Sequence, residues 1–251
     1  GLLHDVSHTA FSHVADFAFG DPQKQDFQDS IHQQILQESL IPALLQKYGL
    51  SLNKILQEKK FTLLDRPLPF LCADRVDYFL RVALNYGELE SGNISKLLTA
   101  LRVADGRMVL TDSRIACWIA KKFLWANKNI WAKPETVAIF YLMGRAVKLA
   151  YDKKIISQAD LFTTDKEFND KMREIKDPEI KSLVVQVKPS IKAREDRENY
   201  DLRVYYKIRY LDPEVMVGKA IQPLSVIDKK YKKELDLYLT KYTGEYFLKI
   251  Y

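Results

Sequence analysis

The sequence predicts a mainly α fold, made of a helical bundle, a small β-hairpin insertion and a C-terminal α+β appendage. Apolar residues recur at helical spacing through the first part of the chain. An Asp-Gly pair separates two short apolar runs, and a later stretch alternates and is rich in β-branched and aromatic residues. We therefore expect a helical domain over residues 1–152 and an α+β region over residues 153–251.

The helical domain is predicted to begin with a short apolar stretch that carries histidines and aspartates and ends at Asp16, and to continue with three amphipathic helices. The residue pair Tyr48-Gly49 is typical of the end of a helix. Pro67 and Pro69 prevent a helix just before the next apolar pattern begins. The three amphipathic helices lie around residues 31–45, 76–84 and 137–147.

The strands are predicted from turn signals and alternation. Asp105-Gly106 forms the turn of a hairpin over residues 101–110. We expect a linker or mobile loop over the charged residues 192–197, and then a strand over residues 202–210. The other expected elements are helical segments at 157–175, 177–184 and 228–241, an apolar run at 215–221 that joins a hairpin or small sheet, and a strand at 246–250.

The composition indicates a globular chain of 251 residues, with 47% hydrophobic residues and only nine Gly and nine Pro. The net charge of +6 comes from 39 basic and 33 acidic residues, so it favours anionic ligands such as nucleotides only weakly. Cys72 and Cys117 are too few for a disulfide framework, which favours a reducing cytoplasm. No apolar run is long enough to cross a membrane, and no leader is evident. Because the chain opens at Gly1 in core-like sequence, we expect it to be a fragment.

The first 16 residues hold three of the four histidines of the chain, together with Asp5 and Asp16. On a helix that turns about 100° per residue, Asp5, His8 and Asp16 fall within roughly 80° of one another, and His4 lies about 40° beyond His8. Imidazole and carboxylate groups bind Mn, Fe, Co, Ni or Zn, and carboxylates with open positions also admit Mg weakly. Since two adjacent ligands are too few, Asp74 at the start of a later helix is a candidate third.

Simpler interpretations of the same residues stay open at this point. An isolated His4-Asp5 pair is more often a salt bridge or a cap than a metal site. Asp74 and Asp77 are also what the N-terminal end of any helix dipole favours. His32 taken alone is typical of a solvated histidine on an amphipathic helix. The clustering of these residue types in one short segment is what favours a site.

Three blocks of residues, in order, resemble the HD-domain metal-dependent phosphohydrolases, and within them the branch of deoxynucleoside triphosphate (dNTP) triphosphohydrolases. The resemblance covers roughly residues 1–90. The blocks are His4-Asp5-x-x-His8-x-x-Phe11-Ser12-His13-x-x-Asp16, His32-Gln33-Gln34 and Asp74-Arg75-x-Asp77-Tyr78-x-x-Arg81.

The resemblance implies that residues 1–152 are an HD-type catalytic domain that releases nucleoside and triphosphate from a dNTP. His4, Asp5 and Asp74 would be metal ligands, joined in the family by a histidine on an upstream helix that this sequence lacks. We therefore expect weaker metal binding, and the fragment is expected to be poorly active. Relatives are commonly oligomers. The implied catalytic residues are His8, Asp16 and His32, with Asp16 accepting a hydrogen bond from His32, and the implied phosphate-binding residues are His13, Arg75 and Tyr78.

The sequence differs from the family pattern at one position that bears on substrate recognition. Val82 stands where the triphosphohydrolases carry an acidic residue that recognises the sugar 3′-hydroxyl, and a valine accepts no hydrogen bond. Ser7 also replaces a frequent Gly, which we expect to be benign. The alternative within the fold is therefore a hydrolase of another phosphate ester, such as a nucleoside monophosphate.

A second alternative is a non-catalytic HD protein that binds nucleic acid or a partner. Lys121, Lys122 and Lys128 are interleaved with aromatic residues, although an amphipathic helix with a basic exposed face explains them about as well. Aromatic residues in the 202–210 strand are suited to stacking on bases, but packing in a sheet is the stronger interpretation.

Overall fold

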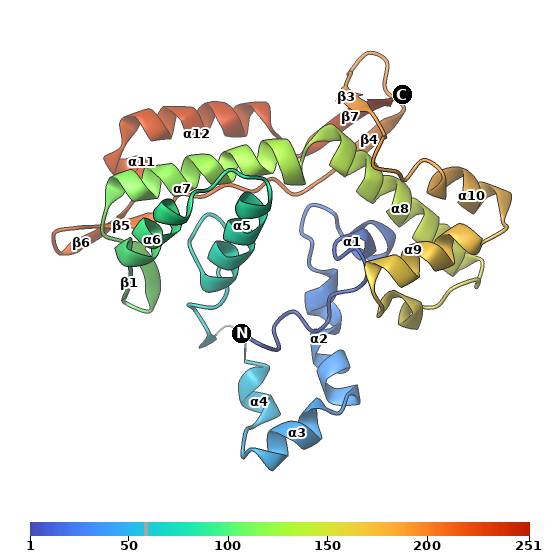
Figure 1. The fold of residues 1–251 in the computed structure, drawn as a ribbon, viewed down its shortest axis with the longest axis horizontal. Helices are drawn as coiled ribbons and strands as arrows, with labels where there is room; N and C mark the ends of the chain where they lie inside the picture. Colours follow the sequence, from blue (N-terminus) through green and yellow to red (C-terminus); the bar gives the residue numbers. More distant parts are fainter. Residues whose placement is uncertain (58–59) are drawn as a thin grey trace. The chain divides into compact units, whose positions relative to one another are not determined.

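The computed structural model describes residues 1–57 and 60–251 and confirms a mainly α fold with small β-sheets (Figure 1). The chain forms two compact units. Unit 1 contains Gly1, Gln57–Trp131 and Ile208–Thr243, and unit 2 contains Leu2–Leu56, Ala132–Lys207 and Gly244–Tyr251. Each unit takes residues from both sides of residue 152, and the domain boundary expected there stays a prediction. Within the described residues, no helix combines the length and the apolar character needed to cross a membrane.

Unit 1 is built on helices that share one apolar core, in which Phe79, Ile119 and Phe123 are fully buried. Helix α12 lies along α7 (Figure 1), and its buried Tyr231 belongs to the same core. The helices predicted at 76–84 and 228–241 are confirmed. The helical elements of unit 1 are α5 (Ala73–Asn85), α6 (Ser91–Ala100), α7 (Ser113–Ala126), the π-helical turn η2 (Asn127–Trp131), α11 (Leu224–Ile227) and α12 (Lys229–Lys241).

The sheet of unit 1 contains the predicted hairpin. Asp105 and Gly106 both have positive φ, of 50° and 67°, which the two-residue turn of a hairpin requires. Leu110 at the end of the hairpin pairs in parallel with Val215. The strand order is β1-β2-β5-β6, with β1 (Leu101–Ala104), β2 (Arg107–Leu110), β5 (Glu214–Val217) and β6 (Ala220–Pro223).

Unit 2 is built around α8, a helix that contains the predicted segment 137–147 and packs closely against α1. At the closest approach, a Cβ on Gly144 would lie 2.3 Å from Cβ of Phe17, so only glycine fits there. The helix predicted at 31–45 is two helices, separated at residues 39–40. The helical elements are α1 (Val14–Phe19), α2 (Phe27–Glu38), α3 (Ile41–Lys47), α4 (Leu52–Ile55), α8 (Pro134–Asp152), the 3-10 turn η3 (Gln158–Leu161), α9 (Asp165–Glu174) and α10 (Pro178–Val184).

The sheet of unit 2 corrects two expectations. The linker or loop expected at 192–197 contains a strand, because the backbone of these charged residues pairs with β7 while their side chains stay exposed. The strand expected over 202–210 ends at Tyr205, and its partner is β7, whereas the run at 215–221 forms the β5–β6 hairpin of unit 1. The antiparallel order is β3-β7-β4, with β3 (Ala193–Glu195), β4 (Leu202–Tyr205) and β7 (Glu245–Ile250).

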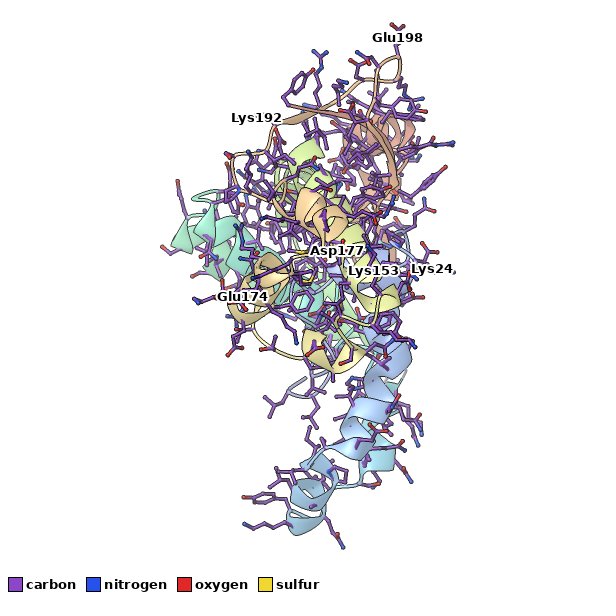
Figure 2. The ribbon with its side chains drawn as sticks, turned by 90° about the vertical axis from the view of Figure 1, so that its right-hand side faces the viewer. Lys24, Lys153, Glu174, Asp177, Lys192 and Glu198 are labelled. Atoms are coloured by element: carbon purple, nitrogen blue, oxygen red, sulfur yellow. The ribbon has the colours of Figure 1, made fainter. Side chains whose placement is uncertain are left out.

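Figure 2 labels six charged residues of unit 2: Lys24, Lys153, Glu174, Asp177, Lys192 and Glu198. Lys153 is one of them, and its Nζ lies 2.8 Å from Oδ2 of Asp177 and 3.1 Å from Oε2 of Glu179. Asp177 also accepts hydrogen bonds from the first backbone N–H groups of α10 and so caps that helix. The predicted helix at 177–184 is thus confirmed together with its cap.

Candidate functional site

The N-terminal segment that carries most of the predicted site residues is not a helix. Residues before Val14 form successive turns, so the predicted helical seam is wrong. Tertiary and side-chain contacts replace the helical hydrogen bonds: Ala10 N donates to Leu161 O at 2.8 Å, and Thr9 Oγ1 donates to Ser12 O at 3.2 Å. Phe11 has a positive φ of 55°, which no α-helix permits.

These turns nevertheless bring the predicted side chains of unit 2 together. Asp5 contacts two imidazoles, with Oδ2 3.2 Å from Nε2 of His4 and Oδ1 3.4 Å from Nε2 of His8. The rings of His8 and His13 meet edge to face, with centroids 5.8 Å apart. Nδ1 of His13 donates to Oδ2 of Asp16 at 3.0 Å. We call these five residues, His4, Asp5, His8, His13 and Asp16, the histidine–aspartate cluster.

The electrostatics of the cluster favour the ionised form of Asp5. The hydrogen bond to His8 is the main cause that lowers the pKa of this carboxyl, and the charges of His4, His8 and His13 act in the same direction. Partial burial opposes them. Asp5 is therefore kept as a carboxylate, the form that binds a cation.

Asp16 is 3% exposed and has a different partner from the one that the resemblance implies. Besides the bond from His13, its Oδ1 accepts a hydrogen bond from the backbone N–H of Phe27 at 3.0 Å. Asp16 thus links α1 to the start of α2 and orients His13, and it does not accept from His32. The carboxylate is satisfied within the protein, as a buried charge must be.

His32 on α2 is 5% exposed, which is inconsistent with the solvated histidine considered above. Its Nδ1 lies 3.0 Å from the hydroxyl oxygen of Ser7, which is also buried. The substitution of Ser for Gly at this position was expected to be benign, yet the structure gives Ser7 a specific partner. Among the described residues, Nδ1 of His8 is buried and makes no hydrogen bond. A buried polar atom of this kind favours a ligand as its partner.

In unit 1, the predicted residues lie on α5. Asp74 lies in the first turn, and its backbone N–H donates to Leu64 O at 3.0 Å, while that of Ala73 donates to Leu63 O at 2.8 Å. The first N–H groups of the helix are thus bonded to backbone carbonyl groups of the preceding loop, and no side chain caps the helix. Asp74 and Tyr78 are four residues apart and share one face of the helix.

Arg75 was predicted to bind phosphate, and in the structure its side chain is 9% exposed and fixes the loop before α5. Nη1 donates to Phe70 O at 2.6 Å and to Sγ of Cys72 at 3.2 Å. Nη2 donates to Arg66 O at 2.9 Å. Both terminal nitrogens are therefore engaged with the loop that positions the start of α5.

Tyr78 packs its ring against Trp131, with centroids 5.5 Å apart, and lies close to Phe123. Burial raises the pKa of the Tyr78 phenol, while the positive charges of Arg209 and Arg75 act in the opposite direction. The hydroxyl is thus kept protonated and available as a donor. Val82, the residue that departs from the family pattern, packs against the core of unit 1.

The contacts of the basic and aromatic residues weaken the nucleic-acid alternative. Lys121 and Lys122 form ion pairs with Glu234 and Glu88, at 2.5 Å and 2.8 Å. Tyr206 is 3% exposed and stacks on Phe17, with ring centroids 6.0 Å apart. These side chains make contacts within the fold, whereas Tyr205 at the end of β4 is 42% exposed.

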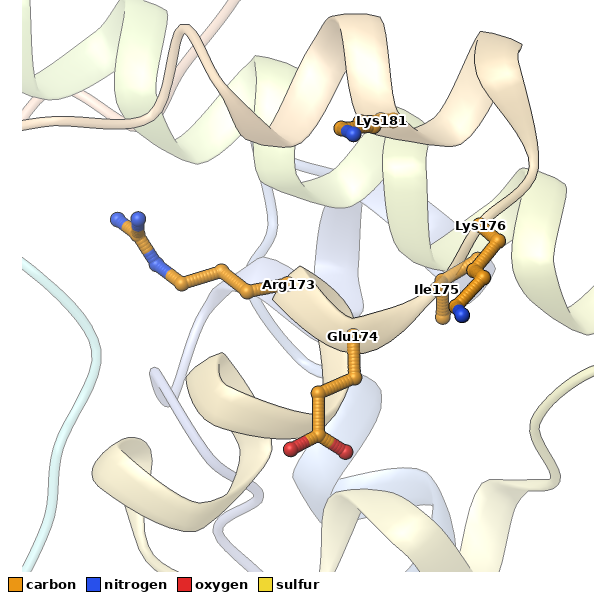
Figure 3. A pocket seen from close by; sticks show the side chains of 5 residues that line it. All are labelled: Arg173, Glu174, Ile175, Lys176 and Lys181. Carbon is orange, nitrogen blue, oxygen red and sulfur yellow. The ribbon is translucent and has the colours of Figure 1, made fainter.

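A surface hollow of about 830 Å³ lies elsewhere in unit 2, where α9 meets α10 (Figure 3). In Figure 3, the carboxylate of Glu174 points away from Lys181, on the opposite side of the hollow. No predicted site residue lines it. The lining residues are Arg173, Glu174, Ile175, Lys176 and Lys181.

The amino-acid sequence of the chain is similar to those of two known proteins. No profile of a known protein family matches it. It is 36% identical over 234 residues to the uncharacterized protein YdhJ of Bacillus subtilis strain 168, which covers 93% of this chain and 72% of YdhJ. The chain belongs to the YdhJ family. It is also 29% identical over 251 residues to the metal-dependent phosphohydrolase cns2 of Cordyceps militaris, covering 96% of this chain and 72% of cns2.

Two solved structures show that this YdhJ family member has a known fold. A hypothetical protein from Aquifex aeolicus matches with a TM-score of 0.62, over 92% of this chain and 72% of its own length. A phosphohydrolase from Bacteroides thetaiotaomicron matches with a TM-score of 0.57, over 98% of this chain and 77% of its own length. Both are 15% identical, so they show the fold alone. The name of cns2 supports the resemblance at the level of phosphohydrolases, and the triphosphohydrolase branch stays a prediction.

Proposed function

We propose that this protein is a metal-dependent HD-domain phosphohydrolase that acts on nucleotides, most like a dNTP triphosphohydrolase that releases nucleoside and triphosphate. The observation that carries the proposal is the histidine–aspartate cluster, in which Asp5 contacts both His4 and His8. The order of the three motif blocks supports it, and so does the similarity to cns2, named a metal-dependent phosphohydrolase.

In this proposal His4, Asp5 and Asp74 hold a divalent cation. The donor set fits, because imidazole nitrogen and carboxylate oxygen suit Mn, Fe, Co, Ni or Zn, and the lowered pKa of Asp5 keeps it in the form of a ligand. The bound ion supplies Lewis-acid chemistry, polarising a phosphoryl oxygen and lowering the pKa of water. The protein itself must bind and orient the phosphate chain and deliver a proton to the leaving group.

The remaining residues divide these tasks. His32 is proposed to protonate the leaving 5′-oxygen, a role that imidazole can fill near neutral pH. The Ser7 hydroxyl beside Nδ1 fixes the orientation of this ring, so that Nε2 is the atom that exchanges the proton. His8 is proposed to lie beside the scissile phosphate, where the buried Nδ1 gains a partner.

Phosphate binding is assigned to His13 and Tyr78, and to Arg75 by its position in the motif alone. His13 donates Nδ1–H to Asp16, which orients its ring. The phenol of Tyr78 donates a hydrogen bond because its raised pKa keeps it protonated. Such donors stabilise the negative charge that develops on phosphoryl oxygens.

The alternative is the same chemistry on another phosphate ester, such as a nucleoside monophosphate. Val82 favours it, because a side chain packed into the core of unit 1 provides no acceptor for a sugar hydroxyl. This alternative changes the substrate and keeps the cluster.

The test is to incubate the natural protein with each dNTP, and separately with nucleoside monophosphates, in the presence of Mn²⁺ or Mg²⁺. We expect nucleoside and triphosphate by chromatography and ³¹P NMR, and no products after chelation of the metal. Asp5→Asn should lose activity at least about 100-fold, as expected for loss of a metal-binding group. Asp170→Asn, which removes an exposed carboxylate paired with Lys166, is the matched control and should retain activity.

Release of phosphate from monophosphates alone would move the assignment to the alternative ester. Absence of turnover on all substrates by metal-loaded protein would refute the phosphohydrolase proposal.

A further inference from the structure

The position of Arg209 in unit 1 is fixed by a buried amide. The backbone N–H of Arg209 donates to Oδ1 of Asn127 at 3.1 Å, and Nδ2 of Asn127 donates to the hydroxyl of Tyr238 at 2.5 Å. Asn127 is fully buried and begins the π-helical turn η2. Turns of this kind are rare and occur frequently at functional sites. The contact holds the backbone of Arg209 against the end of α7.

The guanidinium of Arg209 and the ring of Tyr78 share one neighbour. The central carbon of the guanidinium lies 5.9 Å from the ring centroid of Trp131, within the range of a cation–π contact. Trp131 is also the ring that Tyr78 meets edge to face. Trp131 therefore brings the Arg209 side chain to the helix face that carries Tyr78 and Asp74.

The electrostatics agree with this placement. After burial, which raises the pKa of Tyr78, the charge of Arg209 is the largest single cause, and it lowers this pKa. The charge of Arg75 and a hydrogen bond from it also lower the pKa, while Asp74 raises it. Arg209 thus acts on the same phenol as the two motif residues of α5.

Arg75 is less suited to a ligand than its motif position implies. Both of its terminal nitrogens donate to the loop of residues 66–72, so it positions the start of α5. A substrate that displaced these bonds would leave partly buried carbonyl groups of Phe70 and Arg66 unpaired, which is costly.

We infer that Arg209, together with Tyr78, binds a phosphate oxygen of the substrate, and that Arg75 positions the α5 terminus that carries Asp74. This inference rests on the proposed function, because it assumes a phosphorylated substrate. It adds to the motif residues an arginine from a segment outside the part of the chain that the resemblance covers. Arginine suits this role because its planar fork binds phosphate oxygens in pairs.

The test uses the natural protein and inorganic triphosphate as the probe, with binding measured by calorimetry and by the fluorescence of tryptophan, since Trp131 lies beside Arg209. We expect Arg209→Gln to weaken binding about 10- to 100-fold, the range for loss of a charge-assisted hydrogen bond. Arg209→Lys should fall between this variant and the unchanged protein, since it keeps the charge but not the fork. The control is Arg114→Ala, because Arg114 is 89% exposed and pairs with Asp112.

The second measurement is the rate of hydrolysis of the substrate that the test of the proposed function identifies. Arg209→Gln should raise KM more for a triphosphate than for a monophosphate, a pattern that a purely structural role does not produce. If the unchanged protein binds triphosphate and hydrolyses nucleotides but Arg209→Gln and Arg209→Lys match Arg114→Ala, the inference is wrong and the proposed function stands. If the unchanged protein neither binds nor hydrolyses, both are wrong. Melting temperatures of all variants show whether a loss reflects unfolding.

Discussion

The turns of residues 1–13 and helix α5 carry most of the predicted site residues of the two units, and they hold them in opposite ways. In α5, apolar residues such as Phe79 bury one face of a regular helix, and the polar residues follow from that periodicity. In the N-terminal turns, the polar side chains bond to one another and the backbone follows them.

This difference shows which interactions determine the backbone conformation of each segment. A helix whose apolar face packs on a core keeps its helical hydrogen bonds, and α5 does so from its first turn. The first turns lack such a packed face, because Leu2 and Val6 are exposed, and they obtain hydrogen bonds elsewhere, from Leu161 O and from Asp165. The spacing of polar residues alone therefore did not predict the structure of the segment.

The largest expected effect is on stability when the buried carboxylate of the N-terminal region is removed. Asp16→Ala should lower the free energy of unfolding by about 3 kcal/mol, because the Phe27 N–H and His13 lose their buried partner. Asp77→Ala on α5 should cost less than about 0.5 kcal/mol, because Asp77 is 62% exposed and its pair with Arg81 is screened. Urea unfolding measures both. Equal losses would show that the two regions do not differ in this respect.

A somewhat smaller effect is expected where α1, which follows the turns, meets α8. Gly144→Ala should destabilise the protein by about 1–3 kcal/mol, because the added Cβ would lie 2.3 Å from that of Phe17. Gly92→Ala in α6 of unit 1 is the matched change, and it should be neutral or stabilising by up to about 1 kcal/mol, since nothing lies within 4 Å. Thermal unfolding followed by circular dichroism compares them. A neutral Gly144→Ala would mean that α1 is not packed tightly on α8.

The smallest effect concerns how helices begin. Unlike α5, α12 has a side-chain cap, and the backbone N–H groups of Tyr231 and Lys230 lower the pKa of the Asp228 carboxyl. A lowered pKa contributes stability above the ordinary value of about 4 that is lost as pH falls through the folded value. Asp228→Asn keeps a cap but does not titrate, so its stability should fall less between pH 5 and pH 3. Parallel curves for the two proteins would show that the cap does not contribute in this way.

The sequence was sufficient to predict the elements that have a clear apolar periodicity or a clear turn signal. Helices α5, α8 and α12 follow from their buried faces, and the β1–β2 hairpin follows from Asp105-Gly106. Strand β3 was missed, because its charged side chains stay exposed and only its backbone pairs with a strand some fifty residues later.

The candidate site was predicted in part. The clustering of histidines and aspartates predicted a site that contains His4, Asp5 and His8, and the structure places these residues in contact. The partner of Asp16 was not predictable, because it depends on turns that are set by Leu161. Arg209 could have been found only as a basic residue near the end of the alternating run at 202–210, and such residues are common.

The attachment of the first turns to a segment far along the chain has a practical consequence. Ala10 bonds to Leu161 and the backbone N–H of Phe11 donates to Oδ1 of Asp165 at 2.7 Å. An expression clone that stops at residue 152 would lack both acceptors, and the imidazoles of the cluster would lose the scaffold that orients them. Any polypeptide suited to crystallisation or to metal titration therefore has to include α9, and the residues of the later elements that complete the two cores as well.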